Sequence, residues 1–201
     1  MSLVRTSISD SSTRGSTRAS SATSPRGRAL QTDQQLTIAA IAQLLSDFDI
    51  AVGSRQERAG AHVWDLDLDG ERRRGLKVTL IYEDRPDGVL VAWAHLAPPL
   101  GDGLRKAYRQ LLEWNDRFLF VKFGIAEDGR PVLSFELHAA TASRDALREG
   151  LARILLIADL LLDEMAPWIW IGGRMPADDA APRRNRPLLS ADPRLPARLE
   201  G

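Results

Sequence analysis

The order of apolar and polar positions divides the chain into helical and extended segments. Thr32 or Asp33 can cap a first helix that ends near Asp49, because its apolar residues recur every three or four positions. These residues are Leu36, Ala40, Ile41, Leu44, Leu45 and Phe48. The segment therefore predicts an amphipathic helix with one face toward a core.

Three extended segments follow the first helix. The first of them places Asp65, Asp67 and Asp69 on one face, and apolar residues with His62 on the other. That second face consists of His62, Trp64, Leu66 and Leu68. The next segment covers 75–83, and the third, 89–96, is apolar on both faces, which is typical of a central strand. Turn residues separate the three, so tight hairpins are expected to join them.

The second half of the chain repeats this alternation. A helix begins at Leu104, and its stripe is Leu104, Ala107, Tyr108, Leu111 and Leu112. Strands are predicted over 118–125 and 132–139, joined by an acidic-glycine turn at 127–130. Ser143 can cap a third helix that runs to about Met165, before Pro167.

The resulting order, α-β-β-β-α-β-β-α, predicts an α+β fold. Because the strands are joined by short turns, we expect a five-stranded antiparallel sheet with helices packed mainly on one face. This single domain covers residues 31–171. A Ser/Arg-rich segment (1–30) and a Pro/Arg-rich segment (172–201) contain little to bury, and we expect both to be disordered tails.

Charge and composition limit the classes of function. The tails are basic, with net charges of +4 and +2, and the central span carries −6. An acidic core does not favour nucleic-acid binding, so any such contact is expected to be weak and made through the tails. Cysteine is absent, which fits a reducing cytoplasm. The longest apolar run, 154–162, contains Asp159 and is too short for a membrane span.

The patterns that resemble catalytic or metal sites are incomplete. Asp65, Asp67 and Asp69 imitate a calcium loop, but the required glutamate at the twelfth position is replaced by Leu76. The three histidines, His62, His95 and His138, lie on three different strands. We therefore predict no catalytic residue, no metal and no cofactor, and the protein is not expected to be an enzyme.

The third helix carries more apolar surface than one sheet requires. One stripe is formed by Leu147, Leu151, Ile154, Ala158, Leu161 and Met165, and a second by Leu155 and Leu162, with Ile157 and Leu160 between them. A helix that lies on a sheet needs one such stripe. The extra width is expected to be covered by the first helix, by the apolar coda 168–171 or by another subunit, unless one chain buries all of it.

Residues 111–165 resemble the YbjN family of bacterial sensory transduction regulators. The resemblance is carried by Leu111-Leu112-Glu113-Trp114-Asn115, by Val121-Lys122-Phe123-Gly124-Ile125, by Asp128-Gly129 and by the helix that closes with Asp159 and Asp163. The order of elements also resembles the type III secretion chaperone fold, or Tir chaperone-like fold. The resemblance implies a non-catalytic homodimer with a stress or regulatory role, and secretion chaperones hold an extended partner segment along apolar grooves.

These observations together predict a cytoplasmic chaperone-like or regulatory module that binds itself and another protein. The expected dimer contact is Leu104, Tyr108, Leu111 and Leu112. The expected partner-binding residues are Trp168, Ile169, Trp170 and Ile171, with strand addition to an open sheet edge as a further mode. The alternative is a small-molecule-binding or enzymatic domain with a cavity between the sheet and the third helix, where His95, Tyr82 and Glu136 would have to meet.

Overall fold

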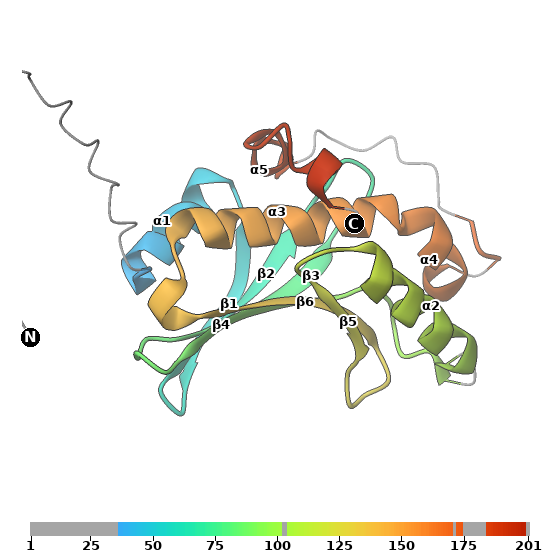
Figure 1. The fold of residues 1–201 in the computed structure, drawn as a ribbon, viewed down its shortest axis with the longest axis horizontal. Helices are drawn as coiled ribbons and strands as arrows, with labels where there is room; N and C mark the ends of the chain where they lie inside the picture. The colour runs from blue at the N-terminus through green and yellow to red at the C-terminus, as the bar shows by residue number, and fades with distance from the viewer. Residues whose placement is uncertain (1–35, 102–103, 171, 175–183, 200–201) are drawn as a thin grey trace, which may run out of the picture. The chain divides into compact units, whose positions relative to one another are not determined.

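The computed structural model describes residues 36–101, 104–170, 172–174 and 184–199 (Figure 1). The strands are β1 (Ala51–Arg58), β2 (Ala61–Leu68), β3 (Leu76–Glu83), β4 (Val89–His95), β5 (Lys122–Ile125) and β6 (Pro131–His138). The helices are α1 (Ile38–Asp47), α2 (Leu104–Arg117), α3 (Arg144–Leu160), α4 (Leu162–Ile169) and α5 (Arg186–Ser190). Two short 3-10 turns are η2 (Ala139–Thr141) and η3 (Pro196–Arg198).

All six strands form one antiparallel sheet in the order β1-β2-β3-β4-β6-β5. The α+β class is confirmed, and the predicted count of five strands is wrong. The sixth strand is β1, whose side chains are exposed or half-buried along its whole length. An edge strand with no buried side chain shows no apolar alternation, so hydrophobic periodicity does not detect it.

The hairpin between β1 and β2 turns through Ala59 and Gly60. Both residues have positive φ, at 51° and 80°. Two-residue hairpin turns of the primed type require positive φ at both central positions, and glycine adopts it without strain. This tight turn holds β1 against β2 although β1 contributes little to the core.

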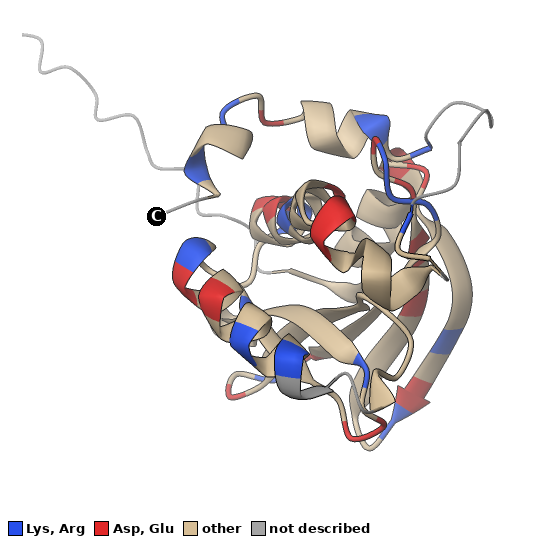
Figure 2. Cartoon of the chain, turned by 90° about the vertical axis from the view of Figure 1, so that its right-hand side faces the viewer, with Lys and Arg blue, Asp and Glu red and all other residues tan. Residues whose placement is uncertain are grey.

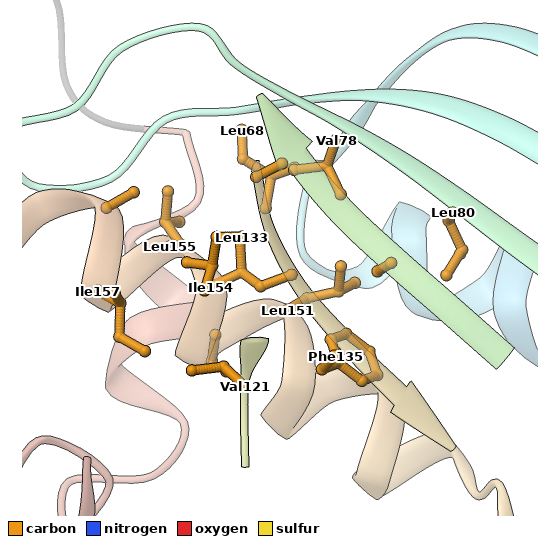
Figure 3. Close-up of a cluster of buried hydrophobic side chains, with 14 of the residues drawn as sticks. Leu68, Val78, Leu80, Val121, Leu133, Phe135, Leu151, Ile154, Leu155 and Ile157 are labelled. Atoms are coloured by element: carbon orange, nitrogen blue, oxygen red, sulfur yellow. The ribbon is translucent and has the colours of Figure 1, made fainter. Parts of the chain in front are cut away.

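The core lies between one face of the sheet and α3 (Figure 3). The apolar face predicted for the first extended segment is confirmed as an inward face, since Trp64, Leu66 and Leu68 are buried. On β6, Leu133 and Phe135 are buried as well. From the helix, Leu147, Leu151, Ile154, Leu155, Ile157 and Ala158 are also buried. The opposite face of the sheet carries no helix of the described chain, and Trp93 on that face is 38% exposed (Figure 1).

Two predicted helix boundaries are wrong. Within the described residues the first helix begins at Ile38, where the Thr37 hydroxyl accepts a hydrogen bond from the Ala40 N–H at 3.1 Å. The proposed caps Thr32 and Asp33 lie outside the described residues. The third helix breaks at Leu161 rather than at Pro167, which lies inside α4.

The end of the chain also differs from the prediction. Residues 184–199, here called the C-terminal segment, form α5 and η3 and lie along α3 on the side away from the sheet (Figure 1). Four of its leucines are buried: Leu188, Leu189, Leu195 and Leu199. The expectation of a disordered tail is therefore wrong for this segment, because these leucines are spaced to pack on the apolar width of α3.

Candidate functional site

A cavity of about 540 Å³ opens where the sheet edge, the N-terminal half of α3 and the C-terminal segment meet. We call it the edge cavity. Its apolar and small lining residues are Phe120, Val121, Phe135, Leu137, Ala146 and Gly150. Its polar lining residues are Lys122, Ser134, Glu136, Glu149, Arg153 and Arg198. A mostly apolar recess with a few charged groups is the usual character of a binding site.

The strand edge beside this cavity is only partly paired. β4 pairs with β6 from Val132 to His138, whereas the ladder between β5 and β6 ends at the pair Lys122 and Ser134. The described residues therefore supply no strand alongside residues 135–138. An edge of this kind presents backbone hydrogen-bonding groups that another extended chain can use.

The direction of these backbone groups follows from the ladder. The Pro131 carbonyl accepts a hydrogen bond from Leu96, which follows β4, and the Ala139 N–H donates to Gly88, which precedes it. Successive residues of a strand direct their backbone groups to alternate sides. Glu136 and His138 therefore direct theirs to the open side, where the Thr141 hydroxyl already donates to the His138 carbonyl.

The outer edge of β5, by contrast, is closed by Asn115. Its side-chain amide donates to the Phe123 carbonyl at 3.0 Å and accepts from the Phe123 N–H at 2.8 Å. The side chain thus takes the place of a neighbouring strand at that position. Asn115 can do this because it lies inside α2, which runs to Arg117, and not at the end of the helix.

The wall of the edge cavity depends on a glycine in α3. A Cβ atom at Gly150 would lie 2.4–2.6 Å from ring atoms of Phe135. The absence of that atom lets the Phe135 ring lie directly against the helix backbone and form the floor of the cavity. A glycine in the middle of a helix costs stability, so a packing reason of this kind is expected for it.

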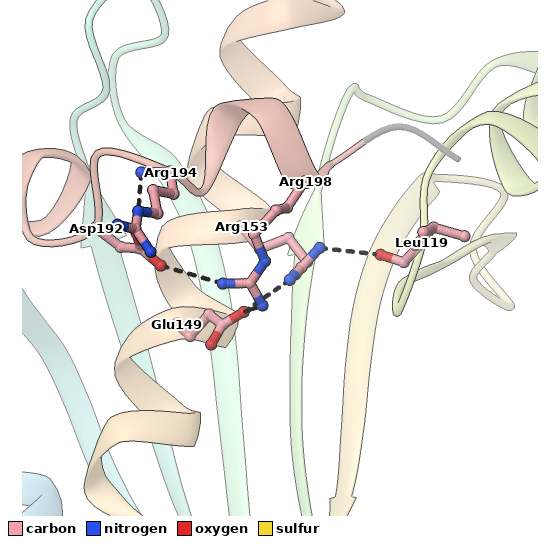
Figure 4. Close-up of polar contacts among 6 residues, drawn as sticks. All are labelled: Leu119, Glu149, Arg153, Asp192, Arg194 and Arg198. Carbon is pink, nitrogen blue, oxygen red and sulfur yellow. Dashed lines mark hydrogen bonds and ion pairs between the residues drawn. The ribbon is translucent and has the colours of Figure 1, made fainter.

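The charged side of the cavity is a small network (Figure 4). The buried Arg153 side chain donates to Glu149 at 2.8 Å and to the Leu119 carbonyl at 3.3 Å. Arg198 reaches the same Glu149 oxygen at 3.4 Å and Asp192 at 3.5 Å. One carboxylate of the lining is therefore shared by two arginines that come from different elements.

Phe120 forms an exposed rim of the cavity. It has a φ of 61° and its side chain is 78% exposed. The Arg153 guanidinium lies 5.3 Å from the centre of its ring, within the range of a cation–π contact. The adjacent Leu119 N–H donates to the Leu199 carbonyl at 3.0 Å. A left-handed, exposed aromatic residue is a costly arrangement that is typical of functional positions.

The second half of α3 is bound to the turn between β2 and β3. The Asp159 carboxylate accepts the backbone N–H groups of Glu71, Arg72 and Arg73 at 2.7, 3.0 and 2.5 Å. Burial raises the pKa of Asp159, and these three hydrogen bonds act against that rise. The N–H groups of such turns form an anion-binding nest, and here the anion belongs to the chain itself.

The carboxylates of Asp69 and Asp163 also bind residues of the turn between β2 and β3. Burial opposes ionisation of Asp69, but hydrogen bonds from Gly75 and Arg184 outweigh it and hold the pKa of Asp69 below its usual value. A hydrogen bond from Arg72 lowers the pKa of Asp163. The buried side chain of Asn185 joins the C-terminal segment to the same region. Its amide oxygen accepts a hydrogen bond from the Asp69 N–H, and its amide nitrogen donates to the carbonyls of Phe48 and Asp49.

The residues predicted for a dimer contact on α2 do not share one exposed surface. Leu111 is 3% exposed and belongs to the core, whereas Tyr108 and Leu112 are 50% and 68% exposed. The side chain of Leu104 lies outside the described residues. Charged residues of both signs surround the exposed pair along α2 (Figure 2). Two of the four residues thus remain available for contact with another molecule.

The apolar coda and the extra width of α3 are largely used inside the chain. Trp168 and Ile169 pack against the core, and the Trp168 ring lies 5.3 Å from that of Trp114. Trp170 is half-buried, and Ile171 lies outside the described residues. The sequence left open whether the first helix, the coda, another subunit or the chain itself covers the extra width of α3. Within the described residues, α1 and the C-terminal segment both contact α3, and the C-terminal segment was not among the expected coverings. Of the α3 leucines, Leu160 stays half exposed.

The polar residues of the alternative hypothesis do not converge. The Tyr82 hydroxyl donates to the Leu36 carbonyl at 2.6 Å, and Glu136 pairs with Lys122 at 2.7 Å. Of His95, Tyr82 and Glu136, the edge cavity includes Glu136 alone. Among the described residues, no group of three or more histidine, aspartate or glutamate side chains could hold a metal ion.

Sequence reasoning missed most of the lining of the edge cavity. Phe120, Glu149, Gly150, Arg153 and Arg198 come from a loop, a helix and a supposed tail, so no spacing in the sequence relates them. Two local signals were present, a glycine in the middle of α3 and an arginine inside its apolar run. Both become meaningful only when the facing strand is known.

Comparison with known proteins gives one family. The model of the YbjN family, described as "Putative bacterial sensory transduction regulator", matches residues 37–169. A search of curated proteins finds no match to the chain. Within the described residues, each helix is too short or too polar to cross a membrane.

Proposed function

Since the chain belongs to the YbjN family, we propose that it is a non-catalytic regulatory module that binds an extended segment of a partner protein in the edge cavity. The observation that carries this proposal is the combination of an open strand edge with an apolar recess beside it. Backbone pairing to residues 135–138 would supply affinity for any extended chain. Side chains that enter the recess would supply selectivity.

The opposite edge of the sheet, formed by β1, is less suited to binding an extended chain than the β6 edge. Among the described residues β1 likewise has no strand on its outer side, but it has a register shift between Val52 and Ser54 and carries Arg55, Glu57 and Arg58. Bulges and charges of this kind protect a sheet edge from unwanted pairing. The edge cavity lies beside β6 instead, where two aromatic side chains, Phe120 and Phe135, line it.

The test uses two matched proline variants. Glu136→Pro removes an N–H on the open side of β6, and Glu57→Pro removes an outward N–H on β1 by the same alternation. Both wild-type residues are glutamates on partly unpaired strands. A phage-displayed library of random linear peptides should yield binders of the wild type and of Glu57→Pro that Glu136→Pro does not retain.

Circular dichroism and thermal melting of both variants give the folding control. Equal retention of the selected peptides by Glu136→Pro would contradict binding at the open strand edge. A small-molecule site is the second candidate, because about 540 Å³ is a normal volume for one. A compound that binds the recess would survive Glu136→Pro, since it needs no backbone pairing, so the same variant separates the two candidates.

We also propose that the module forms a homodimer through the outer face of α2. Tyr108 and Leu112 are one helical turn apart and both exposed, and this is the observation that supports the proposal. Leu112→Glu should lower the mass measured by light scattering at micromolar concentration, and Phe120→Glu, at an apolar site that is at least as exposed, should not. A wild-type protein that is monomeric at every concentration would contradict the proposed homodimer.

A further inference from the structure

We infer that the edge cavity selects extended segments with an acidic side chain next to an apolar one, and that Arg198 binds the acid. This inference rests on the proposed function and adds the chemistry of the partner. It begins from the charges that line the cavity. Lys122 and Glu136 pair with each other at 2.7 Å, whereas Arg153 and Arg198 share Glu149. The lining therefore has one positive charge in excess.

The two arginines are not equivalent. Arg153 is buried, makes a 2.8 Å bond to Glu149 and lies against the Phe120 ring, so its role is to hold the rim in place. The Arg198 side chain is 56% exposed, and its contacts of 3.4 and 3.5 Å are at the outer limit of hydrogen bonding. Arg198 can therefore turn toward an incoming carboxylate without losing a short bond.

The surroundings strengthen such a contact. Phe120, Phe135 and Leu137 line the same recess, and a charge pair beside apolar walls is screened less than one in open water. Asp192 lies near Arg198 but does not line the cavity. An acid that enters from the strand edge thus meets the excess positive charge, and an arginine–carboxylate pair gives it a defined geometry.

The proposed anion-binding group lies outside the part of the chain that the family model matches. Arg198 belongs to the C-terminal segment, which lies beyond the family-matched residues 37–169. The segment is fixed at the rim by the bond from the Leu119 N–H to the Leu199 carbonyl. The open edge and the apolar floor come from the matched region, and the anion-binding group comes from outside it.

The experiment compares peptides selected from the same random library on the full chain and on two charge reversals. Arg198→Glu changes the proposed group. Arg194→Glu is the matched control, since Arg194 is an exposed arginine four residues earlier on the same segment and does not line the cavity (Figure 4). Peptides enriched on the wild type and on Arg194→Glu should carry aspartate or glutamate beside an apolar residue. Peptides enriched on Arg198→Glu should carry lysine or arginine there instead.

A quantitative arm covers the case in which charge reversal disturbs folding. One enriched peptide and its analogue with the acid replaced by the corresponding amide are titrated into the wild type and into Arg198→Gln. The Kd ratio of the two peptides should be about fivefold on the wild type and close to one on the variant. An unchanged acidic preference on both Arg198 variants, with binding still lost on Glu136→Pro, would overturn this inference alone. If no selected peptide loses binding on Glu136→Pro, the proposed function is overturned together with this inference.

Discussion

The two halves of α3 serve different purposes, although they belong to one continuous helix. In the C-terminal half, the Asp159 carboxylate accepts three backbone N–H groups, and just beyond this half Asp163, in α4, pairs with Arg72 at 2.6 Å. In the N-terminal half, Ala146 and Gly150 face a cavity, and the charged neighbours Glu149 and Arg198 are 3.4 Å apart. One half is bound to the sheet by short polar contacts, and the other leaves space beside it.

The difference shows how a small domain can be both rigid and able to bind. The closed half fixes the position of the helix on the sheet through charge-assisted hydrogen bonds, which are the stronger kind. The open half then keeps its small residues at a fixed distance from Phe135 and the β6 edge. A recess held by a rigid neighbour binds with less loss of conformational freedom than one that must form first.

The largest expected effect is on the closed half. Asp159→Asn replaces one acceptor oxygen with a donor that faces a backbone N–H, so at least one partly buried N–H of the β2–β3 turn loses its partner. We expect the free energy of unfolding to fall by about 2–3 kcal/mol, measured by urea denaturation. Asp163→Asn, at an exposed position in the adjoining helix α4, is the control and should change stability little. Equal losses in the two variants would contradict a special role for the Asp159 nest.

An intermediate effect is expected on the open half. Gly150→Ala places a Cβ atom 2.4–2.6 Å from Phe135 ring atoms, and the ring must move into the edge cavity. The strain should cost about 1–2 kcal/mol after the better helix propensity of alanine is included. Peptides selected on the wild type should bind this variant weakly, which fluorescence anisotropy would show.

The double variant Gly150→Ala with Phe135→Leu sharpens this test. The smaller leucine removes the contact with the new Cβ atom, so the two substitutions should be strongly non-additive in stability. Additive losses would mean that the close approach of Phe135 to α3 does not determine the shape of the recess.

The smallest effect concerns pH and the β2–β3 turn, to which the closed half of α3 is bound. The pKa of Asp69 is held below its ordinary value of 3.8 by Gly75 and Arg184. The stability that this ionised group contributes is present above pH 3.8 and is lost as the pH falls through the lowered pKa. Asp69→Asn should therefore be less stable than the wild type at neutral pH, and the gap should narrow on acidification. A gap that widens below pH 4 would contradict the lowered pKa.

Local sequence pattern determined the class of fold, the buried faces of β2, β3 and β6, and the Ser143 cap of α3, because each depends on residues close together in the chain. It also placed Asp159 and Asp163 in a motif without giving them a role. The pattern missed β1 because an exposed edge strand has no buried face to mark it. The tertiary structure alone decided that residues 184–199 cover α3 and that Gly150, Phe135 and Arg198 meet at one recess. These contacts join residues far apart in sequence, and their spacing is set by packing rather than by helix or strand periodicity.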